Sequence, residues 1–319
     1  MLFEQLVNFP TFLITWGTFF AAGIVTFLIQ MYRNRQILSF RAFMRHCFPF
    51  NVWSTKTVHM DVKIYIVRKC TDFLFVTPSL ASTALVSTIV SQSLRWLVPN
   101  YVVTRPTYLI IVGCSVAIFL VVEFSDYLVH YLEHRIPFLW ELHKVHHSAV
   151  FLNPLTSKRG HSLPLVYVSI ASGSFSALPV GVFAFLFGFS LPEALVLRTI
   201  GSKIGSIATF DPLKHSHFPM SFGWFDKILI SPHMHQVHHS SLEPHWDTNF
   251  GTNLSIYDWM FGTGYRPSKD EPIVYGIAGY DEVAMQQYDT LAGVYIRPLL
   301  KIWRMIVPDA GSAKATTAS

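Results

Sequence analysis

The chain has 319 residues, of which 51% are hydrophobic and only 13% are Asp, Glu, Lys or Arg, and its net charge is +5. Ordinary soluble domains contain about 25% charged residues, so the composition argues against a soluble globular surface and favours a membrane protein. The three cysteines (Cys47, Cys70 and Cys114) are scattered and odd in number, which excludes a disulfide framework and fits a reducing compartment.

Four stretches that are almost free of charge predict the membrane helices: 5–34, 73–94, 106–122 and 160–192. A span needs about 20 apolar residues at 1.5 Å each, so the first three stretches suit one helix each. The fourth is too long for one helix and holds Pro179, Val180 and Gly181 near its middle, which predicts two legs with a break there. The expected fold class is an all-α integral membrane protein with about four to five transmembrane helices and a cytoplasmic, helical, His-rich metal-binding cap.

The basic residues predict the orientation of these helices. Stretch 5–34 lacks a basic leader and is followed by arginines, which favours an uncleaved anchor over a signal peptide. The loop 33–72 carries eight Lys or Arg residues and is therefore expected on the cytoplasmic side, where anionic lipid headgroups attract such a charge. Because the hairpin of the fourth stretch would leave from that side and return to it, segments 130–161 and 215–239 are expected on one face.

Ten of the 15 histidines form a pattern of helical spacings. Positions four apart, or three and four apart, share one face of a helix. The pattern consists of His130 and His134; His143, His146 and His147; His235, His238 and His239; and His161 and His215 at the two ends of the hairpin. A lone histidine near a membrane is usually a polar tip at the interface. Eight in three phased clusters instead indicate a metal site, since imidazole nitrogen binds Zn, Cu and Fe well.

The number of histidines indicates two metal ions. Four ligands suffice for a structural zinc ion, and three with water for a catalytic one. Soluble di-iron bundles use a Glu-x-x-His motif, and no Glu of this sequence is followed by a His three residues on. A His-rich pair of irons with open positions for dioxygen remains.

The three ordered boxes resemble those of the fatty acid hydroxylase and sterol desaturase superfamily, membrane-bound di-iron oxygenases, and in particular its sterol desaturase branch. The resemblance runs from about Asp126 to Tyr265 and includes DYLVHYLEHRIPFLWELHKVHHS and DTNFGTNLSIYDWMFGTGY. It implies that the eight box histidines ligate the metal pair, and that His161 and His215 are further ligands. Pro164, His217 and Tyr257 depart from residues common in the family and leave the surroundings of the site open.

Two acids could orient the ligands, since metal-bound histidines usually donate their second N–H to a carboxylate or carbonyl. Asp126 lies four residues before His130 and is expected to pair either with that histidine or with an arginine. Asp247 could play the same role after the last box. Three roles stay open for Glu123: helix packing, contact with a substrate hydroxyl, or a position past the bilayer edge.

The expected activity is the O2-dependent hydroxylation or desaturation of an unactivated C–H bond in a lipid. A separate electron donor, of ferredoxin or cytochrome b5 type, is implied because the sequence contains no GxGxxG, flavin or CxxCH motif. Sterol-like, acyl and ether lipids all stay open as substrates. The alternative is a membrane-embedded zinc hydrolase or isomerase, which would need an acidic base beside the metal. A metal transporter is disfavoured because the predicted spans hold few polar residues.

Three regions are expected along the chain. Residues 1–72 form an anchor and a basic loop, 73–268 the catalytic domain, and 269–319 a C-terminal region. That last region contains an amphipathic stretch, 291–307, and a disordered tail, 309–319. The sequence ends without a dilysine or KDEL-like retrieval signal, which favours a bacterial inner membrane over the endoplasmic reticulum.

Overall fold

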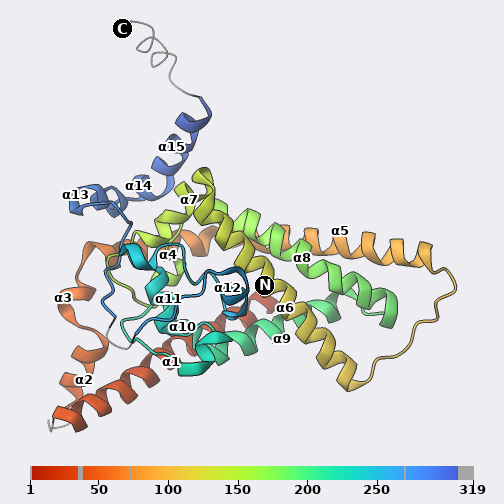
Figure 1. The fold of residues 1–319 in the computed structure, drawn as a ribbon, viewed down its shortest axis with the longest axis horizontal. Coiled ribbons are helices and arrows are strands. Elements are labelled where there is room, and N and C mark those ends of the chain that lie inside the picture. The colour runs from red at the N-terminus through yellow and green to blue at the C-terminus, as the bar shows by residue number, and fades with distance from the viewer. Residues whose placement is uncertain (1, 35–38, 72, 269–270, 308–319) are drawn as a thin grey trace, which may run out of the picture.

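The regular elements of the protein are helices. A computed structural model describes residues 2–34, 39–71, 73–268 and 271–307, so the predicted tail 309–319 lies outside the described residues. Five helices are long: α1 (Leu2–Asn34), α5 (Phe73–Leu97), α6 (Tyr108–Arg135), α8 (Leu163–Phe187) and α9 (Leu191–Ala208). The shorter helices gather at one end of the molecule (Figure 1). The all-α prediction is confirmed.

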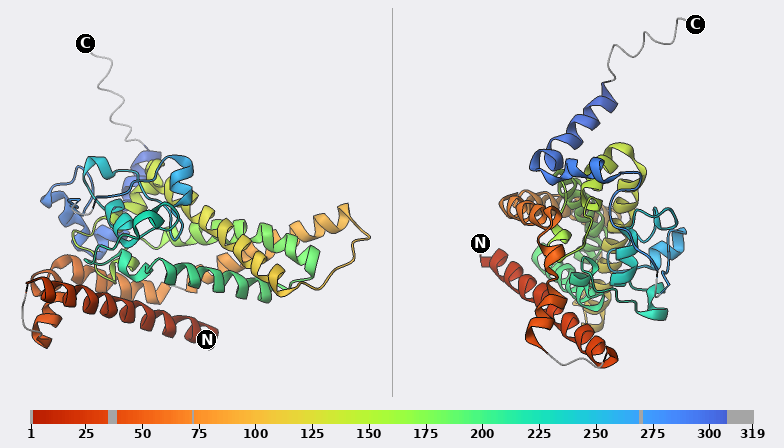
Figure 2. Two further views of the ribbon diagram at one scale, coloured as in Figure 1. Left: turned by 60° about the horizontal axis from the view of Figure 1, so that its bottom comes forward. Right: turned by 90° about the vertical axis from the view of Figure 1, so that its left-hand side faces the viewer.

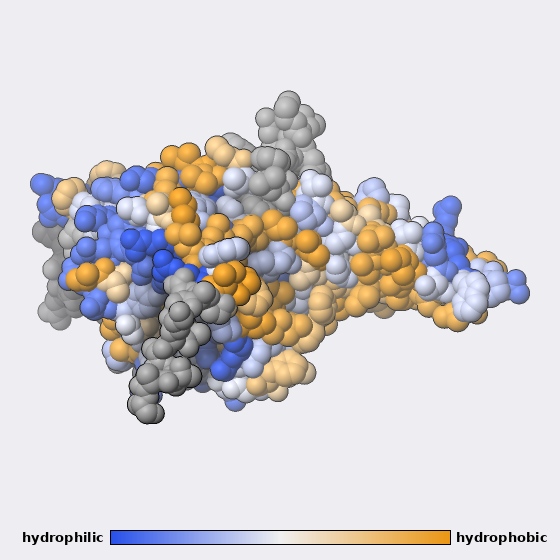
Figure 3. All heavy atoms as spheres, turned by 90° about the horizontal axis from the view of Figure 1, so that it is seen from above, coloured by the Kyte–Doolittle hydropathy of each residue, from blue (hydrophilic) through white to orange (hydrophobic). Residues whose placement is uncertain are grey.

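Helices α5, α6, α8 and α9 form an elongated bundle, which we call the helical body. Helix α8 packs along α5 and also contacts α6, which in turn packs against α9. The connections 98–107 and 188–190 lie at the far end, and the cap, residues 50–71, 136–162, 209–268 and 271–296, lies at the other (Figure 1). Apolar residues cover much of the body's surface, whereas hydrophilic residues collect at its tip and over the cap (Figure 3). This surface is what a bilayer around the body requires.

Two helices of the body, α6 and α8, are long and apolar enough to cross a membrane. The pair formed by α4 (Lys56–Thr71) and α5 is bent by 49° and would count as a third span if taken as one. Helix α9 carries Glu193, Arg198 and Lys203 within its 18 residues, so its composition is less apolar. Two to three spans are therefore supported in the described residues, and the expected four to five stay a prediction.

The fourth apolar stretch does form a hairpin, but the break expected at Pro179, Val180 and Gly181 is wrong. Helix α8 continues through these residues and ends at Gly188, whose φ of +70° suits glycine. Ser190 then caps α9, and Glu193 completes a capping box. Gly181 serves packing instead of a turn, because a Cβ there would lie 2.6 Å from Cβ of Val90 on α5.

The cap brings together segments that are distant in sequence. Met60 and Ile64 of α4 form a buried cluster with Val145 of α7 (Pro137–His147) and Val294 of α14 (Leu291–Tyr295). Figure 2 shows α1 beside the body, reaching the cap at its C-terminal end. There it packs against α2 (Phe40–Cys47) and α10 (Asp211–Lys214). The basic residues of α4 and the histidine boxes thus share one end of the molecule.

The remaining cap helices are short. They are α3 (Phe50–Trp53), η1 (Thr156–Lys158), η2 (Gly223–Lys227), α11 (Pro232–His238), η3 (Glu243–His245), α12 (Ile256–Phe261), α13 (Glu282–Met285) and η4 (Gln286–Asp289). Next to the cap, α15 (Arg297–Ile306) exposes Leu300, Trp303 and Ile306, and carries three basic residues. The amphipathic character expected for 291–307 therefore resides in α15.

The contact between α5 and α8 at Gly181 can be tested by adding one methyl group. In Gly181→Ala the new carbon would also lie 2.8 Å from the carbonyl oxygen of Ser87, so backbone must move. We expect a loss of about 1–3 kcal/mol of unfolding free energy, as is usual for overpacking, seen as a lower melting temperature in detergent. Gly113→Ala on α6 is the control, because nothing lies within 4 Å of that position. Equal melting temperatures for the two variants would contradict the close packing.

Candidate metal centre

Nine of the ten expected ligands come together in two adjoining groups. The first group consists of His130, His134, His143, His147 and His238. The second group consists of His146, His215, His235 and His239. Within each group the potential ligand atoms all lie within 4.8 Å of one another. The rings of His147 and His239, one from each group, have centroids 4.6 Å apart, so the groups form a continuous centre.

The helices deliver the histidines in a reciprocal way. The end of α6 supplies His130 and His134 on one face, as the spacing of four predicts. In α7, the box HKVHHS sends its first and third histidines to the first group and its second to the second group. The box HQVHHS at α11 does the reverse: His238 joins the first group, and His235 and His239 join the second. Each box therefore contributes to both groups.

The ring nitrogens show which tautomers are present. His130 donates from Nδ1 to the carbonyl of Phe250 at 2.8 Å, and His143 places Nδ1 2.8 Å from a carboxylate oxygen of Glu133. These acceptors cannot donate, so in the neutral rings the hydrogen is on Nδ1 and Nε2 carries a lone pair. The two Nε2 atoms nevertheless face each other at 3.2 Å. Two lone pairs cannot form a hydrogen bond, whereas a cation between them would satisfy both.

The second group repeats this geometry. His146 donates from Nδ1 to the carbonyl of Arg159 at 3.0 Å, and its Nε2 lies 3.2 Å from Nε2 of His215. Nε2 of His235 and of His239 lie 3.1 and 3.2 Å from the same atom of His215. A set of four imidazole nitrogens directed at one point is a donor set that suits iron, zinc or copper.

Two further histidines of the first group have the same outward hydrogen bonds. His238 donates from Nδ1 to the carbonyl of Thr248 at 2.7 Å, and His134 places Nδ1 3.3 Å from a carboxylate oxygen of Asp247. Their Nε2 atoms are buried and lack a hydrogen-bond partner. Buried polar atoms are normally paired, so a metal ion is the natural partner for both.

Burial favours the neutral form of His147, His215 and His239, which is the form that binds metal. Desolvation lowers the pKa of His215 to about 4, although nearby Asp211 opposes this shift. Desolvation also lowers the pKa values of His147 and His239 well below the usual value, and neighbouring histidines lower them further. Proton competition at these nitrogens is therefore weak at neutral pH.

The tenth expected ligand, His161, lies outside both groups. Its Nε2 is 3.0 Å from the carbonyl oxygen of Tyr295, and its Nδ1 accepts from the N–H of Leu163 at 3.1 Å. Both ring nitrogens thus have backbone partners, and the ring joins the start of α8 to the end of α14. His217 also lies apart, with Nε2 3.0 Å from the carbonyl oxygen of His46.

The acids proposed as partners of the ligands have different positions. Asp247 lies beside His134 and also contacts Arg135 at 3.2 Å. Asp126 does not orient His130. It hydrogen-bonds with Ser172 and interacts electrostatically with Arg198 of α9. Of the two partners expected for Asp126, His130 or an arginine, the structure therefore contains the arginine. The reason is depth, because Asp126 lies one turn further into the helical body.

The structure assigns contacts to two further carboxylates. The sequence did not indicate a role for Glu133, and it left the role of Glu123 open. Glu133 bonds to His143 and accepts from the Tyr167 hydroxyl at 2.7 Å. It lies three residues after His130, so the spacing argument used for the histidines could have found it. Glu123 accepts from the backbone and side chain of Asn253, both at 2.7 Å. Of its three alternatives, it therefore has the packing role and joins α6 to the loop 249–254.

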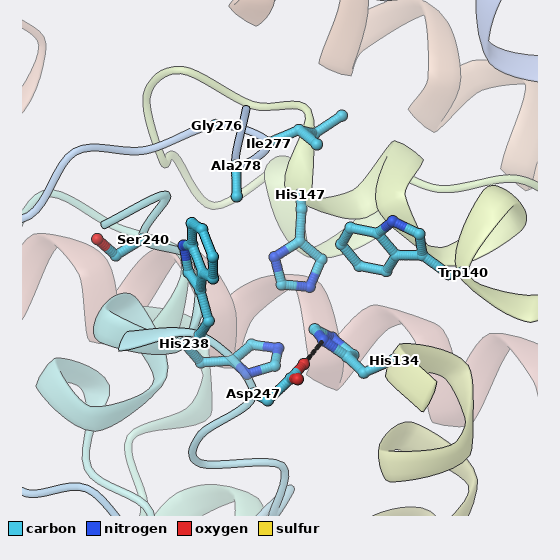
Figure 4. A pocket seen from close by; sticks show the side chains of 10 residues that line it. His134, Trp140, His147, His238, Ser240, Asp247, Gly276, Ile277 and Ala278 are labelled. Carbon is cyan, nitrogen blue, oxygen red and sulfur yellow. Dashed lines mark ion pairs between the residues drawn. The ribbon is translucent and has the colours of Figure 1, made fainter. Parts of the chain in front are cut away.

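A pocket of about 220 Å³ opens beside the first group. His134, His147 and His238 line it, as Figure 4 shows, and the indole rings of Trp140 and Trp246 also border it. The rest of the wall comes from Ser240, Asp247 and 276–278. A small molecule or part of a larger one in this pocket would lie next to the metal ligands.

Comparisons with known proteins agree with this centre. Residues 115–263 match the family model described as fatty acid hydroxylase. An ornithine lipid hydroxylase from Rhizobium tropici is 31% identical over 159 residues, which are 50% of this chain and 44% of that protein. An alkylglycerol monooxygenase from Danio rerio is 30% identical over 161 residues, and one from Caenorhabditis elegans is 25% identical over 166 residues. These matches cover 50% and 52% of this chain, and 32% and 30% of the two proteins.

No solved structure matches the chain. The chain spans less than half the length of the curated relatives that it matches. The sterol desaturase branch, expected from the boxes, is not confirmed by these relatives. The matched region contains all nine clustered histidines, so the similarity to the fatty acid hydroxylase family lies in the part of the chain that forms the centre.

Proposed function

We propose that this protein is a membrane-bound lipid hydroxylase that uses two iron ions, dioxygen and electrons from a separate donor. The observation that carries the proposal is the facing of buried imidazole lone pairs in two adjoining groups of histidines. One ion would be held by each group. The names of the relatives, a hydroxylase and monooxygenases of lipids, support the same reaction class.

The reaction requires a balanced supply of electrons. A lipid C–H bond, one O2, two electrons and two protons give a C–OH bond and one water. When bound, the iron ions supply the reductive activation of dioxygen. The electrons come from a redox protein of ferredoxin or cytochrome b5 type, since the sequence holds no motif for a flavin, a haem or a dinucleotide.

The residues of this chain hold the ions and position the lipid. Five rings have an acceptor at Nδ1, which fixes the direction of Nε2 in His130, His134, His143, His146 and His238. Trp140 and Trp246 form an apolar boundary beside the first group that limits access of water. With about 220 Å³, the pocket is smaller than the roughly 300–1,000 Å³ of sites that enclose whole ligands. We therefore infer that only the reacting part of the lipid occupies it.

We favour a lipid with an acyl or alkyl chain as the substrate over a sterol. The named relatives act, by their names, on an ornithine lipid and on alkylglycerols, and a narrow pocket accepts a chain more readily than fused rings. Hydroxylation is favoured over desaturation for the same reason, since the relatives are named as hydroxylase and monooxygenases.

We place the histidine centre on the cytoplasmic side of a bacterial inner membrane. The basic helix α4 lies in the cap with the centre, and the positive-inside rule assigns such residues to the cytoplasm. A reducing compartment also suits the three free cysteines.

Metal analysis of protein purified in detergent tests the centre. We expect two iron ions per chain in the wild type, and a loss of metal in His238→Ala and His146→Ala because each removes one ligand. His217→Ala is the matched control: this histidine is partly buried, as His146 is, but it bonds to a backbone carbonyl outside the groups. His161→Gln should likewise keep both ions.

The same measurement separates the rival activities. Two zinc ions in the purified protein, with no lipid oxidation after exchange for iron, would support a zinc hydrolase or isomerase instead. Full metal content in His238→Ala or His146→Ala would remove that residue from the ligand set.

Filling the pocket tests where the lipid reacts. Ala278 points into the pocket (Figure 4), so in Ala278→Phe the new ring should occupy the space beside His147 and His238. We expect at least a tenfold loss of hydroxylated lipid with unchanged iron content, measured by mass spectrometry of lipids from cells expressing each variant. Ala292→Phe, at an exposed position of α14, should match the wild type. Normal product from Ala278→Phe would show that the lipid reacts elsewhere.

A further inference from the structure

A buried acid outside the metal centre is linked to it through one arginine. Asp61, on α4, has no exposed surface and belongs to none of the histidine boxes. Its Oδ1 accepts from Nη1 of Arg159 at 2.8 Å. Its Oδ2 accepts from Nδ2 of Asn153 at 2.6 Å and from the Thr156 hydroxyl at 2.7 Å. Three partners from the segment 153–159 thus converge on the Asp61 carboxylate.

Arg159 carries this contact to the second group. Its Nε donates at 2.9 Å to the hydroxyl of Ser148, the residue that directly follows the last histidine of α7. Its backbone carbonyl accepts from Nδ1 of His146 at 3.0 Å. The guanidinium of Arg159 is therefore held from two sides, by Asp61 and Ser148, and a shift of the arginine would move the carbonyl that accepts from His146.

A gain in stability alone does not explain why this ion pair is buried. The side chains of Asp61 and Arg159 are 0% and 1% exposed, and desolvating two charges offsets much of their attraction. What such a pair does supply, when all of its hydrogen bonds are made, is one defined geometry. Here that geometry determines the position of a carbonyl which touches a ligand.

We propose that Asp61 is a positioning residue for the metal ion of the second group, acting through Arg159 on His146. This inference rests on the proposed function, because it requires that the histidines bind metal. Asp61 lies before residues 115–263, so it is outside the region that matches the family model.

The first group has a counterpart that allows a matched comparison. Asp258 of α12 accepts from the N–H groups of Phe250 and Gly251 at 2.7 and 2.9 Å. The carbonyl of Phe250 accepts from His130. Asp258 therefore holds an acceptor for the first group just as Asp61 holds one for the second group.

The experiment measures the two ions separately. Protein loaded with iron-57 is titrated with a chelator, and Mössbauer spectra report each iron. In Asp61→Asn, one oxygen becomes a donor that faces the donors of Asn153 and Thr156. We expect affinity to fall about 10- to 100-fold, the usual range for outer-shell changes, at one ion only. That ion should be the one lost in His239→Ala, a ligand of the second group alone.

The other variants serve as comparisons. Asp258→Asn should weaken the other ion, the one lost in His134→Ala. Asp226→Asn is the control for removing a buried carboxylate: Asp226 is fully buried and accepts from Ser221 and from the N–H of Phe222. It should bind both ions as the wild type does.

If Asp61→Asn does not fold, the double variant Asp61→Leu with Arg159→Met can be used. It removes both charges together, a replacement that buried pairs often tolerate. It should show the same loss of affinity at the ion of the second group only. Wild-type affinity at both ions in a folded variant, or an equal loss at both, would overturn the positioning role. A wild type that binds no metal would instead overturn the proposed function.

Discussion

This structure depends on one constraint: the lone pairs of buried histidine nitrogens face one another within the cap. Each Nδ1 hydrogen that points outward to a carbonyl or carboxylate leaves an Nε2 lone pair directed inward, as in His130, His146 and His238. Without a cation these buried nitrogens lack partners, and each such group costs about 1–3 kcal/mol. Fixed hydrogen-bond acceptors for Nδ1 are therefore as necessary as the ligands. In the cap, loops 159–161 and 247–254 supply backbone acceptors of this kind.

Much of this architecture could be predicted from the sequence, because apolar length and helical spacing are local properties. Stretches of suitable length became α5 and α6, and the spacing of four placed His130 and His134 on one face. The division of each box between the groups could not be predicted, since it depends on how α7 and α11 cross. Backbone acceptors such as the carbonyl of Phe250 have no signature in side chains. The sequence misplaced the break, which lies at Gly188, because a glycine such as Gly181 can serve close helix packing as well as a turn.

The position of the centre relates its chemistry to the membrane. The histidines lie where α6 leaves the apolar body and enters the polar cap. A lipid held against the body would have its polar part at this level, close to the pocket beside His134. The proposed function therefore does not require the histidines to be buried in the bilayer, where the cost of unpaired polar groups is several kcal/mol each.

The hairpin of α8 and α9 has a consequence for how such proteins can diversify. It starts after Ser162 and ends before Thr209, both at the cap, so its two ends are tied to the metal centre while its turn at Gly188 is remote from it. Adding a helical turn to both legs would lengthen the hairpin by about 5.4 Å and leave every ligand in place. One residue inserted into α7 would instead rotate the following histidines by about 100°. Evolution can therefore fit the fold to bilayers of different thickness, whereas the register of the boxes admits no such variation.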